Sequence, residues 1–363
     1  MNKYNESIIY DDATLIVEEY LYEFKKLKNN KIIISGGAGF LLSYFCYIIE
    51  IVNEKFKIPV KLIVLDKFFF GLPFRLKKFK KKKYIKFINI DLSESLPKNL
   101  NCDYFIHGAS IASPTYYRKF PIETIKVNVS CLLKIFDKLC TLKKKVKSII
   151  FMSSSEVYGN PDLFNIPTNE NYFGNVSFTG PRACYDESKR IGETICVNYF
   201  QKKKLPIKII RPFNVYGPRQ SERAIIPTII RQALQNNIKN FDLGNLNPTR
   251  DFTYVEDTVD AFIKVMKNKK VFGQVLNVGS NKKISISLLS KEIMKLTDSK
   301  KLVKINSVRK RPKLSEVENL QCNNKKIKKI TNWKPKINLK KGLKKTLEWF
   351  KKNKNFHSNQ YII

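Results

Sequence analysis

Short apolar runs alternate with helical patterns through the first 214 residues of the chain. Apolar runs suited to buried strands occupy residues 31–35, 60–66, 86–92, 102–110, 146–155 and 206–214. Helical patterns occupy residues 40–56 and the segments from Ile122 to Leu142 and from Asp186 to Lys203. Strands that alternate with helices pair in parallel, and their helices cover both faces of the sheet. The sequence therefore predicts an α/β fold.

The alternation changes after residue 218, which predicts a second region. Residues 1–30 read as a helical lead-in, because acids come early in the pattern and lysines come late. We expect residues 31–218 to form the main domain, 219–352 a smaller mixed α/β region, and 353–363 a tail. An apolar run at 275–280 predicts a late strand that returns to the main sheet.

The chain carries 68 Lys and Arg residues against 31 Asp and Glu, a formal net charge of +37. Proteins that bind nucleic acids gather their positive charge on one face. Here the excess is lysine scattered along the whole chain, without an arginine-rich helix or a basic stripe interleaved with aromatic residues. We therefore predict no nucleic-acid partner, although small anions such as nucleotide diphosphates would be attracted.

The sequence offers no pattern for a metal site or a membrane span. Its seven cysteines form no CxxC pair, and His107 and His357 are its two histidines, so no zinc site is expected. No apolar run reaches the roughly 18 to 20 residues of a transmembrane helix. The N-terminus does not resemble a secretory signal. These observations predict a cytoplasmic protein.

A glycine-containing turn follows the first strand. In "GGAGFLL", Gly36 and Gly39 have the first two places of a G-x-x-G-x-x-G spacing, and Leu42 has the third. Such a turn brings the backbone close to a pyrophosphate, and the third glycine permits close helix packing. Leu42 therefore predicts a helix slightly farther from the strand.

Two carboxylates complete the predicted nucleotide site. Asp66 ends the second strand, where a carboxylate accepts hydrogen bonds from ribose hydroxyls. It would repel the 2′-phosphate of NADP, so NAD is the predicted cofactor. Asp91 follows the third strand and is placed to meet the adenine. Together with the glycines, these residues predict a Rossmann-type, doubly wound parallel sheet.

Tyr185 and Lys189 in "CYDESKR" have a Y-x-x-x-K spacing, which puts both side chains on one face of a helix. A tyrosine with its ordinary pKa of about 10 is a poor base near neutral pH. We expect the ammonium of Lys189 to lower that pKa. Tyr185 would then take a proton from a sugar hydroxyl while the nicotinamide accepts a hydride. Ser154, at the end of a preceding strand, would donate a hydrogen bond beside it.

From about Lys31 to Phe350, the sequence resembles the extended short-chain dehydrogenases/reductases that act on nucleotide sugars. The resemblance rests on the segments "GGAGF", "LDKFFFG", "IHGASIASP", "SSSEVYG", "PRACYDESKR", "RPFNVYGPR" and "TRDFTYVEDTVDA". Within that family it is most similar to the UDP-glucuronate decarboxylases (UDP-xylose synthases), which share "LDKFFFG", "ASPTYYRKFPIETIKVN" and "PRACYDESKR". Leu42 and the lead-in at 1–30 depart from the pattern.

The resemblance implies three groups of site residues. It implies NAD binding by Gly36, Gly39, Phe40, Asp66, Asp91, Ala109, Tyr185 and Lys189. It implies catalysis by Ser154, Ser155, Glu156, Tyr185 and Lys189. It implies contacts with a nucleotide sugar for Tyr117, Asn214, Arg219, Arg223 and Arg250, with Tyr117 and Arg250 near a substrate carboxylate. A purely structural ion pair remains an alternative for Arg250 and Arg219. The main domain would thus bind NAD, and region 219–352 would mainly bind substrate.

Ser155 and Glu156 bear on the step that follows oxidation at C4. A 4-keto sugar with a carboxylate at C5 is a β-keto acid, which loses carbon dioxide readily. Glu156, or a water held by Ser155 and Glu156, would return a proton to C5. A 4,6-dehydratase of this family has an Asp–Glu pair in these two places, and a serine hydroxyl is too weak an acid to replace the aspartic acid.

Decarboxylation of UDP-glucuronate to UDP-xylose, with NAD recycled internally, is therefore the favoured interpretation. A nucleotide-sugar 4,6-dehydratase of the dTDP-glucose type and a 4-epimerase stay open. A non-catalytic nucleotide-binding or nucleic-acid-binding protein is a remote alternative, because Tyr185, Lys189 and Ser154 are all present. It is kept because fold alone does not fix function. The family usually forms homodimers through two helices of each subunit, for which residues 123–140 and 186–202 are the candidates.

Overall fold

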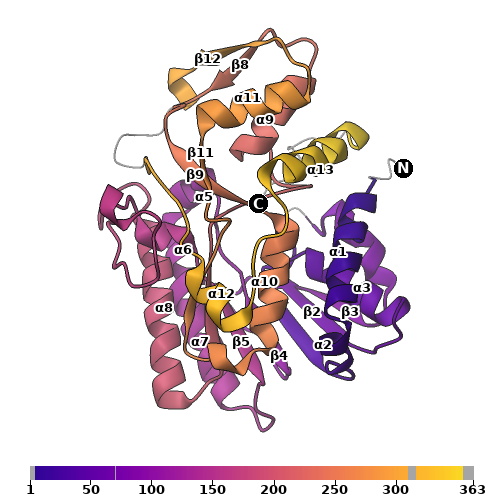
Figure 1. The fold of residues 1–363 in the computed structure, drawn as a ribbon. Coiled ribbons are helices and arrows are strands. Elements are labelled where there is room, and N and C mark those ends of the chain that lie inside the picture. The colour runs from indigo at the N-terminus through magenta and orange to yellow at the C-terminus, as the bar shows by residue number, and fades with distance from the viewer. Residues whose placement is uncertain (1–4, 70, 310–315, 355–363) are drawn as a thin grey trace.

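The computed structural model describes residues 5–69, 71–309 and 316–354. Seven strands form one parallel sheet in the order β10-β6-β5-β4-β1-β2-β3 (Figure 1). This arrangement confirms the predicted α/β, doubly wound fold. The strands are β1 Lys31–Ser35, β2 Lys61–Asp66, β3 Ile85–Asn89, β4 Tyr104–His107, β5 Ser148–Met152, β6 Ile207–Pro212 and β10 Val275–Val278.

Both faces of the sheet are buried under helices. Ile32 and Ile34 of β1 belong to the same apolar cluster as α3 and α10, whereas Ile33 belongs to the cluster of α7 and α8. Neighbouring residues of a strand point to opposite faces, so one apolar run supplies both layers. The bounds of these helices are α3 Tyr44–Glu54, α7 Cys131–Cys140, α8 Ala183–Lys203 and α10 Val255–Lys267.

The order of the strands reverses between β1 and β4. From β1 the chain runs outward through β2 and β3, then crosses back to β4 on the other side of β1. Ligands of such sheets bind outside the carboxyl ends of the strands at this reversal. The residues that follow β1, β2, β4 and β5 therefore meet at one edge of the sheet.

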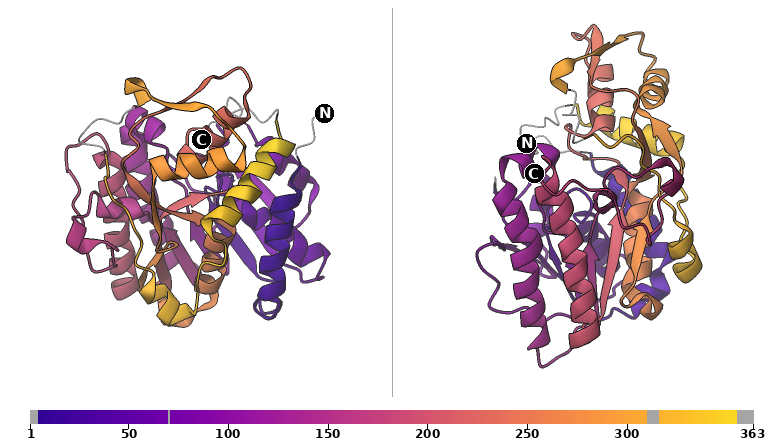
Figure 2. Two further views of the ribbon diagram at one scale, coloured as in Figure 1. Left: turned by 45° about the horizontal axis from the view of Figure 1, so that its top comes forward. Right: turned by 90° about the vertical axis from the view of Figure 1, so that its left-hand side faces the viewer.

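The helix expected from Ile122 to Leu142 is less regular than predicted. It consists of α6 Pro121–Ile125, a π-helical turn at Lys126–Ser130, and α7. Within the π turn, the buried Asn128 donates a hydrogen bond from Nδ2 to Ser188 Oγ of α8, at 2.8 Å. Figure 2 shows α7 and α8 side by side on one flank of the molecule.

Much of the later part of the chain builds a smaller unit above the sheet, at the top of Figure 1, whereas α12 lies low in the same view and contacts β10 of the main sheet. Two small sheets have the strand orders β11-β9-β7 and β12-β8. Among the described strands of this part, β10 lies in the main sheet beside β6. The elements of this part are β7 Asn214–Tyr216, α9 Ile225–Leu234, β8 Asn240–Leu243, β9 Thr249–Tyr254, β11 Lys283–Ser285, α11 Ile286–Leu296, β12 Leu302–Ile305, α12 Lys325–Thr331 and α13 Leu339–Lys352.

The N-terminal lead-in is helical where it is described and packs onto the main body. It contains α1 Ser7–Glu19 and α2 Leu21–Lys25, and α1 lies against α3 (Figure 1). The buried Asp12 accepts hydrogen bonds from Tyr254 at 2.9 Å and from Lys345 at 2.5 Å. These contacts join the lead-in to the C-terminal part of the chain. Most of the predicted tail, including His357, lies outside the described residues.

Two short helices follow β2 and β4, namely α4 Phe74–Lys77 and α5 Pro114–Lys119. Within the described ranges, no helix has the length and apolar character needed to cross a membrane. The same ranges contain no group of three or more His, Cys, Asp or Glu side chains suited to holding a metal ion.

Candidate active site

A cavity of about 1170 Å³ opens at the carboxyl ends of the parallel strands. Residues of both the main domain and the later region line it. All the predicted site residues except Lys189 and Arg219 belong to its lining, namely Gly36, Gly39, Phe40, Asp66, Asp91, Ala109, Tyr117, Ser154, Ser155, Glu156, Tyr185, Asn214, Arg223 and Arg250. The fold thus gathers residues that lie far apart in the sequence.

Gly36 makes the sharp turn after β1. Its φ of 71° is a left-handed value that residues with side chains rarely adopt. A Cβ atom built there would lie 2.7 Å from the backbone of Ala109, which follows β4. Only glycine therefore lets the two strand ends approach this closely.

Leu42 replaces the third glycine of the motif, and the structure accommodates it through Gly108. Leu42 is buried, and its Cδ1 would lie 2.3 Å from a Cβ atom placed on Gly108. The leucine thus fills the space that a side chain at the end of β4 would need. Residues 40–43 form turns and α3 begins at Tyr44, so the helix starts later than the sequence predicts.

Replacing Gly108 with Ala is expected to destabilise the protein by about 1–3 kcal/mol, because the added methyl group overpacks a filled site. Shortening Leu42 to Val in the same chain should recover part of that loss. Thermal or denaturant unfolding of both single variants and the double variant measures the coupling. Free energies that add to within about 0.5 kcal/mol would contradict a direct contact.

The two predicted nucleotide-binding carboxylates have different surroundings. Asp66 accepts a hydrogen bond from the backbone N–H of Ala38 at 3.0 Å, and burial raises its pKa. Asp91 is partly buried, which opposes its charge, but hydrogen bonds from Lys67 and Ser93 outweigh that effect and lower its pKa. The Lys67 Nζ lies 2.5 Å from Asp91 Oδ2. Asp66 thus lies at the glycine turn. The lowered pKa of Asp91 means that its side chain is held in the ionised form.

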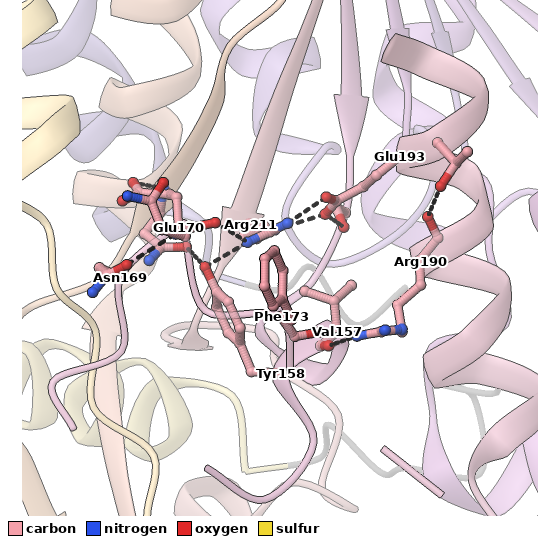
Figure 3. Close-up of polar contacts among 12 residues, drawn as sticks. Val157, Tyr158, Asn169, Glu170, Phe173, Arg190, Glu193 and Arg211 are labelled. Carbon is pink, nitrogen blue, oxygen red and sulfur yellow. Dashed lines mark hydrogen bonds and ion pairs between the residues drawn. The ribbon is translucent and has the colours of Figure 1, made fainter. Parts of the chain in front are cut away.

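A buried polar network holds the segment that follows β5 (Figure 3). Arg211 of β6 forms two contacts with Glu193 of α8, at 2.8 and 2.5 Å, and donates to the Tyr158 hydroxyl at 2.6 Å. Glu193 also accepts from Ser153 Oγ at 2.5 Å. On the same helix, Arg190 donates to the Val157 carbonyl at 3.0 Å. Both ends of the "SSSEVYG" segment are therefore tied to α8.

Tyr185 of α8 reaches the same place from the other side. Its ring stacks on Tyr117, with centroids 5.1 Å apart. Burial raises the pKa of Tyr185, and a hydrogen bond with Ser154 offsets this only in part. The predicted lowering of this pKa by Lys189 is wrong, because the Lys189 ammonium is directed at the Met152 carbonyl, 2.9 Å away. Burial also lowers the pKa of Lys189 to about 8.

Glu156 and Ser155 begin the 3₁₀ turn at Ser155–Tyr158. Ser154 caps this turn by accepting a hydrogen bond from the Glu156 N–H at 3.2 Å. The carboxylate of Glu156 forms an ion pair with Arg182, which also lines the cavity. Ser155 is buried. The Ser155–Glu156 pair thus lies beside Tyr185 with an arginine in contact with its acidic member.

Three of the predicted substrate residues, Asn214, Arg223 and Arg250, line the same cavity. Arg250 of β9 is largely buried and pairs with Glu316 at 3.2 Å. Arg223 lies over the Tyr116 ring, 4.8 Å from its centroid. The buried Oδ1 of Asn214 has no hydrogen-bond partner within the described part of the chain, so it can accept a hydrogen bond from a ligand.

Comparison with known proteins identifies the family. The sequence model of the family described as GDP-mannose 4,6 dehydratase matches residues 33–346. This chain belongs to that family. The match spans the glycine turn, the Tyr185 helix and the later region, and the predicted membership of the extended short-chain dehydrogenases/reductases is confirmed.

Relatives and a solved structure of this family cover most of the chain. UDP-glucuronic acid decarboxylase 5 of Arabidopsis thaliana is 32% identical over 91% of this chain and 92% of its own length. UDP-glucuronic acid decarboxylase 1 of Xenopus tropicalis is 32% identical over 92% of this chain and 75% of its own length. The structure of dTDP-glucose 4,6-dehydratase from Bacillus anthracis, in complex with NAD, has a TM-score of 0.74 at 21% identity and covers 91% of this chain and 99% of its own. At that identity, the likeness concerns the fold.

Arg219 lies away from the cavity, so its predicted contact with the substrate needs correction. The side chain is 1% exposed. Its guanidinium lies 5.0 and 5.1 Å from the ring centroids of Tyr44 and Tyr47, and 3.7 Å from a carboxylate oxygen of Glu6. In this member of the GDP-mannose 4,6 dehydratase family, Arg219 therefore packs against α3 and the N-terminal lead-in.

Two charged residues of the site were not predicted from the sequence. Arg182 immediately precedes α8 and contacts Glu156, and its place in "PRACYDESKR" was the available signal. Glu316 also lines the cavity and pairs with Arg250, but no motif marks it. Both are partners of residues that the family resemblance did single out.

The residues at the strand ends fit NAD. Gly36 leaves no room for a side chain between two strand ends, which suits close approach of a pyrophosphate. Asp66 lies in the same cavity at the end of β2, where it would hold the ribose hydroxyls of the adenosine. Ser154 and Tyr185 lie farther along this cavity. This family's cofactor would therefore reach from the glycine turn to the catalytic pair.

Proposed function

We propose that this protein decarboxylates UDP-glucuronic acid to UDP-xylose through transient oxidation at C4. One observation carries the proposal: the Ser154–Tyr185 pair, the Ser155–Glu156 pair and Arg250 share one cavity. The first pair suits removal of a proton from a sugar hydroxyl, and the others suit a carboxylate on the same sugar. Relatives at 32% identity that are named UDP-glucuronic acid decarboxylases support the same reaction.

Tyr185 takes the proton of the C4 hydroxyl, and Ser154 holds that hydroxyl in place with a hydrogen bond. Bound NAD supplies the hydride acceptor for C4, a positive charge that favours the Tyr185 phenolate, and the same hydride for the final reduction. Lys189 Nζ lies 5.8 Å from the centroid of the Tyr185 ring and donates to the Met152 carbonyl at the end of β5, beside Ser154. Tyr185 later returns its proton to the oxygen at C4.

Loss of carbon dioxide follows because the C5 carboxylate lies β to the new ketone. The bond between C5 and the carboxyl carbon breaks, and its electron pair is delocalised into the C4 carbonyl. Arg250 orients the carboxylate without closing on it fully, because Glu316 shares its guanidinium. The weaker contact between Arg250 and the substrate carboxylate favours the reaction, because tight binding of the ground state alone does not raise the rate. Glu156 then protonates C5.

The Ser155–Glu156 pair distinguishes this reaction from dehydration. A 4,6-dehydratase must protonate a leaving C6 hydroxyl, and the buried Ser155 hydroxyl is too weak an acid for that step. A 4-epimerase would need no acid at Glu156, because it neither breaks a bond to C6 nor protonates C5. The proposed decarboxylation uses Glu156 to return a proton to C5.

A substrate panel tests the proposal. The purified protein with NAD should convert UDP-glucuronic acid to a UDP-pentose with release of carbon dioxide, identified by mass spectrometry. dTDP-glucose and UDP-glucose should remain unchanged under the same conditions. A 4-keto-6-deoxy product from either neutral sugar would instead make the protein a dehydratase. A UDP-hexuronate epimer would make it an epimerase.

We also propose that two copies pair through α6, α7 and α8. These helices expose apolar side chains, among them Ile122 at 60%, Ile125 at 42% and Ile191 at 43%. Because α6 and α8 are in contact, these side chains favour an interface on this flank. Light scattering of the wild-type protein is expected to give the mass of a dimer. The double variant with Ile125→Glu and Ile191→Glu is expected to give the mass of a monomer. A wild-type monomer would contradict this pairing.

A cytoplasmic location remains a prediction from the sequence.

A further inference from the structure

Arg182 stands between two carboxylates at the wall of the cavity. Its Nη2 pairs with Glu156 and lies 3.3 Å from Asp186 Oδ1. Arg182 and Asp186 are both buried, whereas Glu156 remains partly exposed to the cavity. One guanidinium is thus shared by an acid that faces the substrate and an acid that does not.

The same turn of chain fixes Arg182 and the catalytic tyrosine. The backbone N–H groups of Tyr185 and Asp186 both donate to the Arg182 carbonyl, at 2.9 and 3.0 Å. Glu156 comes from the other side of the cavity, on the turn that Ser154 caps. Arg182 is therefore the charged link between the helix that carries Tyr185 and the turn that carries Ser155 and Glu156.

The charges around Asp186 explain why Arg182 is shared. Burial raises the pKa of Asp186 to about 6, Arg182 and Arg190 oppose this, and Glu187 adds to it. A guanidinium presents several donors in a fixed fork, so it can hold one carboxylate while a second competes for it. Asp186 keeps Arg182 within reach of Glu156 without neutralising it completely.

We propose that Arg182 is a positioning residue, which aims Glu156 at C5 and compensates the negative charge that Glu156 gains when it gives up its proton. This inference rests on the proposed decarboxylation. Glu156, a carboxylate in its ion pair with Arg182, first takes a proton from solvent. That O–H bond then breaks, a C–H bond forms at C5 with the electron pair left by carbon dioxide, and Glu156 becomes a carboxylate again. Solvent then supplies the next proton. Overall, one substrate carboxylate and one proton give one C–H bond and carbon dioxide.

The two halves of the reaction should respond differently to loss of Arg182. Oxidation at C4 depends on Tyr185 and Ser154. Burial raises the pKa of Tyr185, and the lowering of that pKa by Arg182 is weaker than the lowering by the Ser154 hydrogen bond. Protonation at C5 depends on Glu156, which Arg182 contacts. Arg182→Gln should therefore slow pentose formation about 10²-fold, while changing the rate of C4 oxidation by less than about threefold. Arg182→Lys should restore part of the loss, because it keeps the charge but not the fork.

Single-turnover mixing with UDP-glucuronic acid tests this division. Absorbance of the reduced cofactor reports C4 oxidation, quenched samples report the pentose, and deuterated water reports how stereospecifically C5 is protonated. Arg190→Gln is the matched control: Arg190 lies on the same helix and holds the same segment through Val157 and Phe173. It should lower stability without changing the ratio of the two rates.

Failure of the proposed function and failure of the proposed role of Arg182 give different results. If the wild-type protein releases no carbon dioxide from UDP-glucuronic acid, the proposed function fails. If the wild type does release it, but Arg182→Gln lowers oxidation and pentose formation by the same factor, or changes neither, Arg182 has no positioning role. Normal stereospecific labelling at C5 in Arg182→Gln would also overturn the inference.

Discussion

Replacing Tyr185 with Phe is expected to lower turnover of UDP-glucuronic acid by about 10³- to 10⁴-fold, the upper part of the range for loss of a general base. The substitution removes the hydroxyl that takes the C4 proton and shares a hydrogen bond with Ser154. It keeps the ring, which is buried and stacks on Tyr117 with centroids 5.1 Å apart. The variant should therefore fold and bind NAD like the wild type. Turnover, unfolding temperature and NAD affinity are the measurements.

The same substitution at Tyr199 is the control for the Tyr185 experiment. Tyr199 also lies on α8, but its hydroxyl donates to Asp137 at 2.6 Å, outside the cavity lining. Tyr199→Phe should keep its turnover. If Tyr185→Phe retained more than about a tenth of wild-type turnover, another group would have to remove the C4 proton.

Replacing Arg250 with Gln is expected to raise the KM for UDP-glucuronic acid by about 10- to 10²-fold, because a hydrogen-bonded charge contact is worth about 1.5–3 kcal/mol. Loss of the guanidinium also leaves Glu316 beside the substrate carboxylate. Glu316→Gln should have the opposite effect and lower KM, since it removes the acid that shares Arg250 at 3.2 Å. Steady-state kinetics of the two single variants and the double variant measure both effects.

Binding of a neutral nucleotide sugar provides the comparison for Arg250. UDP-glucose lacks the carboxylate, so Arg250→Gln should change its dissociation constant by less than about twofold, well under the loss of one charge-assisted hydrogen bond. Equal weakening of both ligands would assign Arg250 to the diphosphate or to the fold. A higher KM in Glu316→Gln would likewise contradict competition for one guanidinium.

The parts of the site that follow the strand pattern could be predicted from the sequence. Asp66 and the glycine turn lie at the ends of neighbouring apolar runs, and parallel strands bring such ends to one edge. The position of Tyr185 in the site can be predicted from its helix and from the strand that precedes that helix. These positions depend on short-range patterns that a parallel α/β fold places in a fixed way.

The parts that depend on packing between distant segments could not be predicted. The space for Leu42 is provided by Gly108 on another strand. Arg219 follows a strand that leads toward the cavity, yet it turns back to Tyr44, Tyr47 and the lead-in. No local pattern encodes contacts of this kind, because each is set by which elements the finished fold makes adjacent.

The electrostatics of the site also required the structure. The Y-x-x-x-K spacing suggests a lysine that lowers the pKa of Tyr185, but burial raises it and Lys189 donates to a carbonyl. Likewise, Arg250 and Glu156 each have a charged partner, Glu316 and Arg182, from a separate part of the chain. A spacing rule gives the neighbours of a residue along one helix, whereas burial and pairing depend on all the elements around it.

Following the carboxyl carbon of the substrate is the most direct test of the proposed reaction. UDP-glucuronic acid labelled with ¹³C at C6 would be incubated with the purified protein and NAD, and both the released gas and the nucleotide sugar would be examined by mass spectrometry. The proposed reaction predicts labelled carbon dioxide in equal amount to an unlabelled UDP-pentose, with no net reduction of NAD. Label retained in a UDP-hexuronate or in any other nucleotide sugar would contradict it.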